Sequence, residues 1–83
     1  MTLNVLYFAS LRERIGQPGE TVETEAATVA DLIDELRGCD ERHALAFSDM
    51  AAVRVAVDQE LCEFSAPLAG VREVAFFPPM TGG

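Results

Sequence analysis

The chain ends in Gly82 and Gly83, and the α-carboxylate of Gly83 is the most chemically distinctive group in the sequence. Neither glycine has a β-carbon, so this end can enter a channel too narrow for any other residue. A carboxylate is a poor electrophile, but attachment of AMP makes it an acyl donor that a sulfur or an amine can attack. The alternative interpretation is a frayed end or a linker remnant, because two terminal glycines are a weak motif alone.

Pro78 and Pro79 precede this end and are followed by Met80 and Thr81. Each proline fixes its own φ and favours an extended, polyproline-like path. Residues 78–83 reach roughly 20 Å when fully extended. We therefore predict a domain over residues 1–77 and a flexible tail over residues 78–83, stiff at its root and mobile at its tip.

The remaining groups with reactive potential are Cys39, His43 and Cys62. Two cysteines do not make a disulfide framework, and a cytosolic chain keeps them reduced. Cys39 and His43 could share a helix face, but no third or fourth ligand is spaced nearby, so we expect no metal site. We interpret all three as ordinary small or surface residues, and a Cys/His enzyme as a remote alternative.

Length and composition predict one globular domain, with 83 residues of which 49% are apolar. No apolar run approaches the roughly 18 residues that a membrane span needs. The start "MTLNVLYFA" lacks a basic region and a cleavage site, so we expect a first strand and a cytoplasmic protein. The net charge of -8 disfavours nucleic-acid binding and favours a positively charged partner protein.

Two strands are predicted near the start of the chain. Residues 3–11 are rich in strand formers, and residues 20–25 alternate weakly as a short exposed strand. Gly16, Pro18 and Gly19 between them are typical of a turn. Together these segments predict a hairpin.

Residues 28–38 carry the clearest helix signal. Thr28 is a good N-cap and Gly38 marks the end, while one face of the helix gathers four apolar residues: Val29, Leu32, Ile33 and Leu36. Residues 40–50 favour a shorter helical turn, with Ala44, Leu45 and Phe47 as candidates for burial.

Further strands are predicted over residues 51–58, 61–64 and 73–77. A single long helix can cover only one face of the resulting sheet. The other face then carries apolar side chains, and such a patch on an acidic protein usually marks an interaction surface. The residues expected there are Leu6, Phe8, Ala56, Ala75 and Phe77.

Three stretches together resemble a known family: "VLYFASLRE", "RVAVDQE" and "VAFFPPMTGG". The family is that of the small subunits of molybdopterin synthase, ubiquitin-like sulfur carriers, and the resemblance spans the whole chain. It implies an α+β fold of the β-grasp type, with a mixed sheet packed on one main helix. It also implies that the first and last strands lie side by side, parallel, in the middle of the sheet.

The resemblance further implies a function for Gly83. A partner adenylyltransferase of the ubiquitin-activating type would adenylate its carboxylate with ATP, and the acyl-adenylate would become a thiocarboxylate. The sulfur would pass to cyclic pyranopterin monophosphate to form the molybdopterin dithiolene. The chain would then be no enzyme alone and hold no permanent cofactor. It would be the sulfur donor in a heterotetramer of two small and two large subunits.

Other site residues follow from the same resemblance. The tail inserted into the large subunit would comprise Pro78, Pro79, Met80, Thr81 and Gly82. Three apolar residues would contact the activating enzyme and the large subunit in turn, namely Phe8, Leu61 and Phe77.

The chain departs from the family at two turns, where Arg72 stands in place of a common acid and Asp58 in place of a frequent Asn. Two alternatives stay open. One is a sulfur carrier for the thiazole of thiamine or for a thiolated tRNA base. The other is a β-grasp interaction module, whose tail is inert or is conjugated to lysines.

Overall fold

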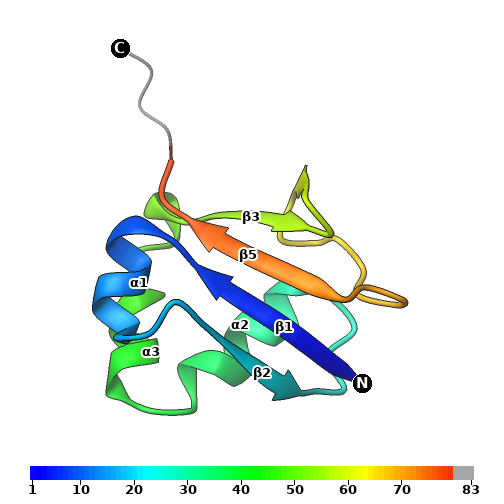
Figure 1. Ribbon diagram of the computed structural model, residues 1–83, viewed down its shortest axis with the longest axis horizontal. Helices are drawn as coiled ribbons and strands as arrows, with labels where there is room; N and C mark the ends of the chain where they lie inside the picture. The colour runs from blue at the N-terminus through cyan, green and yellow to red at the C-terminus, as the bar shows by residue number, and fades with distance from the viewer. Residues whose placement is uncertain (80–83) are drawn as a thin grey trace.

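The computed structural model describes residues 1–79, so Met80, Thr81, Gly82 and Gly83 lie outside the described part. A five-stranded sheet has the order β2-β1-β5-β3-β4. β1 and β5 pair in parallel, and the other neighbouring strands pair antiparallel (Figure 1). The predicted mixed sheet, with its first and last strands adjacent, is confirmed. The strands are β1 (Thr2–Tyr7), β2 (Gly19–Glu23), β3 (Arg54–Val57), β4 (Glu60–Cys62) and β5 (Glu73–Phe77).

The helical elements gather against one face of this sheet, and α2 passes behind β1 in Figure 1. α2 is the longest helix, as the apolar pattern predicted. The elements are α1 (Ala9–Ile15), α2 (Val29–Arg37), α3 (Glu41–Ala46) and one 3-10 turn, η1 (Met50–Ala52).

The predicted hairpin between the first two strands is wrong in its connection. The chain forms α1 directly after β1, where we expected the strand to continue and then turn. Leu11 and Ile15, four residues apart, are buried on one face of this helix. Gly16 ends it with φ of 91°, in the left-handed conformation that glycine adopts readily, and its N–H bonds the Arg12 carbonyl. β1 and β2 still pair antiparallel, but across a helix.

α2 begins where the sequence predicted. The hydroxyl of Thr28 accepts a hydrogen bond from the N–H of Asp31 at 3.2 Å, which satisfies a donor that the first helical turn leaves free. The helix ends at Arg37, and Gly38 is its C-cap in a right-handed conformation with φ of -80°. The end of α2 therefore needs no left-handed glycine.

α3 confirms the predicted short helix but corrects its buried face. Phe47, after its end, is fully buried as expected, whereas Ala44 is exposed and Leu45 is 60% exposed. His43 and Ala46 are the buried residues of the helix. The Asp40 side chain caps α3 by accepting from the N–H of His43, and this cap sets which side of the helix meets the core.

The strand expected over residues 51–58 is shorter, because η1 occupies residues 50–52. β3 and β4 are joined by two residues, Asp58 and Gln59, with φ of 48° and 71°. Two positive φ values in a two-residue loop match the twist of a hairpin. The Asp58 carboxylate also accepts from the N–H groups of Arg72 and Glu73, both at 3.0 Å. Asp58 therefore ties this turn to the start of β5.

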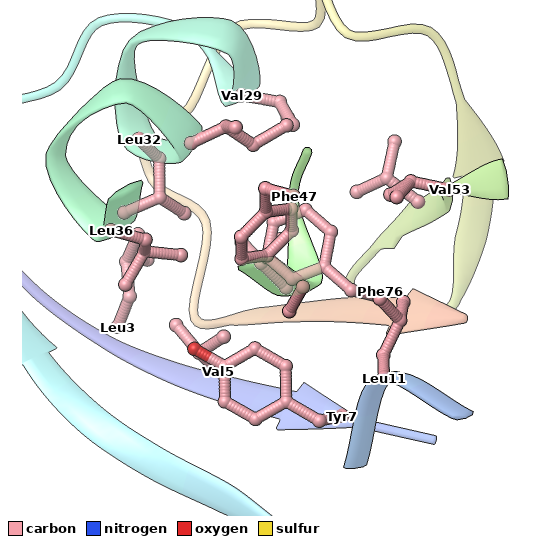
Figure 2. Close-up of a cluster of buried hydrophobic side chains, with 14 of the residues drawn as sticks. Leu3, Val5, Tyr7, Leu11, Val29, Leu32, Leu36, Phe47, Val53 and Phe76 are labelled. Carbon is pink, nitrogen blue, oxygen red and sulfur yellow. The ribbon is translucent and has the colours of Figure 1, made fainter. Parts of the chain in front are cut away.

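The core lies between the sheet and α2. In Figure 2 the β1 side chains Leu3 and Val5 point toward Leu32 and Leu36 of α2. An aromatic cluster fills the other end of the core, where Phe76 stacks on Tyr7 and meets Phe47 edge-on with ring centroids 5.0 Å apart. The core residues are Leu3, Val5, Tyr7, Leu11, Ile15, Ala26, Val29, Leu32, Ile33, Leu36, Ala46, Phe47, Val53, Val55, Leu68, Val74 and Phe76.

The Thr28 cap gives a testable consequence for folding. Thr28→Ala removes the acceptor for the Asp31 N–H and should lower the free energy of unfolding by about 1 kcal/mol. Thr28→Ser keeps a hydroxyl in place and should lower the free energy of unfolding much less. Urea unfolding at one pH measures both variants, and equal losses in Ala and Ser would show that the cap does not stabilise α2.

Candidate docking face and tail root

The face of the sheet away from the helices, called here the open face, carries a continuous apolar row. Strand register places Leu6 of β1 beside Ala75 of β5, Ala75 beside Ala56 of β3, and Ala56 beside Leu61 of β4. The alternate residues of the same strands pack against the helices, because successive side chains of a strand point to opposite faces of the sheet. Leu61 is 77% exposed, and Leu6 and Ala56 are half-buried. Ala75 itself is only 8% exposed, so the exposed apolar surface of this row, called here the apolar strip, comes from Leu61, Leu6 and Ala56.

A second row lies nearer to the end of the sheet from which the tail leaves. Phe8 follows β1, is 47% exposed, and its N–H donates to the Phe76 carbonyl at 3.0 Å, continuing the ladder by one bond. Phe77, the last residue of β5, is half-buried and lies opposite Arg54. Ala9 has φ of 51°, an uncommon conformation for a residue other than glycine, and turns the chain immediately after Phe8. Two aromatic side chains therefore flank the root of the tail.

The structure places the predicted interface residues on or beside one surface. Leu61 and Phe77 are on open-face positions, and Phe8 lies at the same end of the sheet as Phe77. Their contact with partner proteins stays a prediction. Pro78 and Pro79 are half-buried and follow β5 directly. The rest of the predicted tail, residues 80–83, is outside the described part of the chain.

The apolar strip has a polar border on the side remote from the tail. Asn4 of β1 lies beside Glu73 of β5, and the Asp58 turn adjoins the same end. Arg54 is the single cationic residue among the open-face positions of the five described strands. The open face therefore has an apolar centre with charges at its margins, as protein–protein interfaces commonly do.

The thiols are poorly placed for nucleophilic chemistry. Burial, and then the charges of Glu20, Asp40 and Glu35, raise the pKa of the Cys39 thiol. Burial is also the largest cause that raises the pKa of Cys62. Because the thiolate is the reactive form, a raised pKa reduces the reactive fraction of both cysteines at neutral pH, although Cys39 is exposed.

His43 corrects a sequence interpretation, because it is no surface residue. Its side chain is buried, and its two ring nitrogens lie at hydrogen-bond distance from Asp40 and Glu20. Neither nitrogen is available to activate a thiol. Within residues 1–79 no three or more His, Cys, Asp or Glu side chains are grouped to hold a metal ion.

The sequence contains only a weak indication that the His43 side chain is buried. Asp40 three residues before His43 is the pattern of a helix cap, and it orients the ring. Nothing local in the sequence pairs His43 with Glu20, 23 residues earlier, because the pairing depends on where β2 ends up in the sheet.

A mixed five-stranded sheet wrapped on one main helix defines the ubiquitin-like β-grasp class. SAMP1 from Haloferax volcanii has this arrangement, with a TM-score of 0.76, 27% identity and coverage of 100% of both chains. The predicted fold is therefore confirmed.

The family model of the ThiS family matches residues 5–83, and the chain belongs to this family. The molybdopterin synthase sulfur carrier subunit of Escherichia coli K12 is 41% identical over 98% of this chain and 99% of that protein. The protein of the same name from Haemophilus influenzae is 37% identical over the same shares. The resemblance inferred from the sequence is thereby confirmed. Among the helices that the structure describes, none has the length and apolarity to cross a membrane.

The assignment of the open face can be tested by stability. Leu61→Ala should change the free energy of unfolding by no more than about 0.5 kcal/mol, because the side chain is 77% exposed. Leu3→Ala, on the core face of β1 and fully buried, should cost about 2–5 kcal/mol. Urea denaturation of both variants makes the comparison, and a loss above 2 kcal/mol for Leu61→Ala would place that residue in the core.

Proposed function

We propose that this chain is the sulfur-carrier subunit of a molybdopterin synthase and that Gly83 bears the sulfur. The observation that carries the proposal is the uncovered apolar strip on the strands beside β5, the strand that leads directly into the Gly-Gly tail. A surface of this kind gives a partner a place to hold the domain while it acts on the end of the chain. The names of the curated relatives support the same function.

The chemistry takes place at the Gly83 carboxylate. A carboxylate oxygen attacks the α-phosphorus of ATP, and pyrophosphate leaves. The terminal sulfur of a donor-protein persulfide then attacks the acyl-adenylate carbonyl, and AMP leaves. A thiol attacks the donor's sulfur in the resulting acyl disulfide, which forms a new disulfide with the donor and releases the thiocarboxylate. The thiocarboxylate sulfur attacks a side-chain carbon of cyclic pyranopterin monophosphate, and an oxygen substituent leaves that carbon. Water then cleaves the acyl–sulfur bond of the resulting thioester, which leaves the sulfur on the pterin and returns the Gly83 carboxylate. Each step needs a partner, so the small subunit is a substrate for one protein and a donor to another.

The open face fits a role with two successive partners. An apolar centre with few charges can pack against different proteins, while charges at the rim chiefly affect the rate of association. The net charge of -8 repels phosphate, so the groups that bind ATP and the pterin phosphate belong to the partners. We propose these partners to be an adenylyltransferase of the ubiquitin-activating type and the large subunit in a heterotetramer.

Incubation of the chain with its activating enzyme, ATP and a sulfur donor should replace one oxygen of Gly83 by sulfur. Intact-mass and tandem mass spectrometry measure the exchange and locate it. Localisation is essential because oxidation of Met80 gives nearly the same change in mass. Absence of exchange at Gly83 with a competent activating enzyme would exclude the proposed function.

Deletion of Gly83 should abolish sulfur transfer and leave the free energy of unfolding unchanged, because the last core residue within residues 1–79 is Phe76. A large loss of stability in this variant would instead favour a structural role for the tail. Conjugates of wild-type Gly83 with lysines of other proteins would favour the modifier alternative.

Leu61→Asp should weaken binding of the large subunit and of the activating enzyme at least about tenfold, because it puts a charge in the apolar strip. Leu45→Asp is the matched control, since Leu45 is also a largely exposed leucine, at 60%, but lies on α3 at the helical face. Isothermal titration calorimetry measures both. Equal effects of the two substitutions would show that the open face is not the docking surface.

A further inference from the structure

A charged cluster around the buried His43 lies outside the docking face and the tail. His43 is 5% exposed, and its Nδ1 lies 2.7 Å from Oδ1 of Asp40. Its Nε2 lies 2.6 Å from Oε2 of Glu20 on β2. The cluster joins α3 to an edge strand of the sheet. Neither the fold class nor the proposed sulfur chemistry requires it.

The hydrogen-bond geometry defines the protonation state of the ring. Carboxylates are acceptors, and neutral imidazole has a single N–H to donate. Both nitrogens of His43 have carboxylate partners, so both bonds exist together only when the ring is the doubly protonated imidazolium. The two oxygens also accept other bonds, Asp40 from the His43 backbone N–H at 2.9 Å and Glu20 from the Tyr7 hydroxyl at 2.7 Å. The backbone donor to Asp40 favours the ionised form of that carboxyl group.

The electrostatic environment agrees with this geometry. Burial by itself lowers the pKa of His43, but the hydrogen bonds to Glu20 and Asp40 outweigh it, and the net effect raises the pKa above its ordinary 6.5. The backbone and ring hydrogen bonds from His43 hold the pKa of Asp40 below its usual value. Burial and the bond to Glu20 raise the pKa of the Tyr7 hydroxyl far above its usual range, so it stays a donor.

The groups that face His43 come from each element around it. β2 contributes Glu20, β1 contributes Tyr7 through the shared Glu20 oxygen, and the cap of α3 contributes Asp40. The Cys39 thiol, after α2, lies close enough to Glu20 and Asp40 for their charges to raise its pKa. α1 also packs against α3, yet no hydrogen bond or ion pair in residues 1–79 joins the His43 ring to it.

The cluster is coupled to the strand that carries the tail. The Tyr7 ring meets His43 edge-on and stacks on Phe76 of β5, with centroids 6.2 Å apart in both pairs. Loss of the His43 charge leaves two carboxylates around a ring that can bond only one of them. Asp40 or Glu20 then loses its partner, and the contact of α3 with the sheet edge weakens.

We propose that the His43 imidazolium is a pH-sensitive latch that holds α3 to β2 at the edge of the sheet. Because the folded pKa lies above the unfolded value, the stabilisation is fully present below about pH 6.5. It is lost as pH rises through the folded pKa. The latch therefore opens on the alkaline side.

The test uses NMR titration, and His43 is the only histidine in the chain, so its ring signals are unambiguous. The wild-type protein should titrate with a pKa above 6.5. Glu20→Gln removes one charge but keeps an oxygen that can accept from Tyr7 and His43, so it should lower the pKa of His43. Glu25→Gln is the matched control, an exposed glutamate beyond the end of β2, and should leave it unchanged.

Urea unfolding between about pH 5 and pH 9 gives the second readout. The free energy of unfolding should fall as pH rises from the unfolded to the raised folded pKa of His43, and in Glu20→Gln the fall should be smaller and end at a lower pH. The two proteins differ only at residue 20, so the difference between their curves isolates the contribution of the latch. A wild-type pKa at or below 6.5, or a Glu20→Gln profile identical to wild type, would overturn the proposal.

Discussion

The parallel pairing of β1 with β5 is the interaction on which the rest of the structure depends. It joins the two ends of the described chain in the middle of the sheet, with Leu6 beside Ala75 and Tyr7 beside Phe76. Along each strand, one side chain faces the helices and the next side chain faces away. The same ladder therefore builds the core and the open face. It also makes the strand before the tail a central one, held by neighbours on both sides.

The shortage of helical chain explains the uncovered face. The main helix α2 and the short helices α1 and α3 pack together against one side of the sheet. Within residues 1–79 no further helix remains to cover the other side. The aromatic cluster of Tyr7, Phe47 and Phe76 anchors β5 from the covered side. The open side is left available for contact with other proteins.

Much of this arrangement could be predicted from local patterns. Thr28 and the apolar stripe of α2 identified the main helix, and the two-sided apolar strands identified an open face that includes Leu6 and Phe77. The prediction failed where a segment carries few apolar residues. In α1 the only buried residues are Leu11 and Ile15. The glycines and the proline that follow led us to predict a turn in place of this helix.

The buried charges could not be predicted, because they depend on long-range pairing. Glu20 looks like one of many acids on an exposed strand, and His43 looks like a surface residue on a short helix. Only the position of β2 at the sheet edge brings their side chains within 2.6 Å. A similar difficulty affects Asp58, whose bonds to the backbone of Arg72 and Glu73 connect two turns that are distant in sequence.

We propose that this domain delivers sulfur from Gly83 to a pterin while a partner holds its open face. The most direct measurement is a single-turnover reaction of the thiocarboxylated chain with the large subunit and cyclic pyranopterin monophosphate. Mass spectrometry follows the carrier, and fluorescence of the oxidised pterin follows the product. A sulfur carrier should lose about two thiocarboxylates for each dithiolene formed, since each dithiolene holds two sulfurs. A carrier that keeps its sulfur, or product that forms without its loss, would contradict the claim.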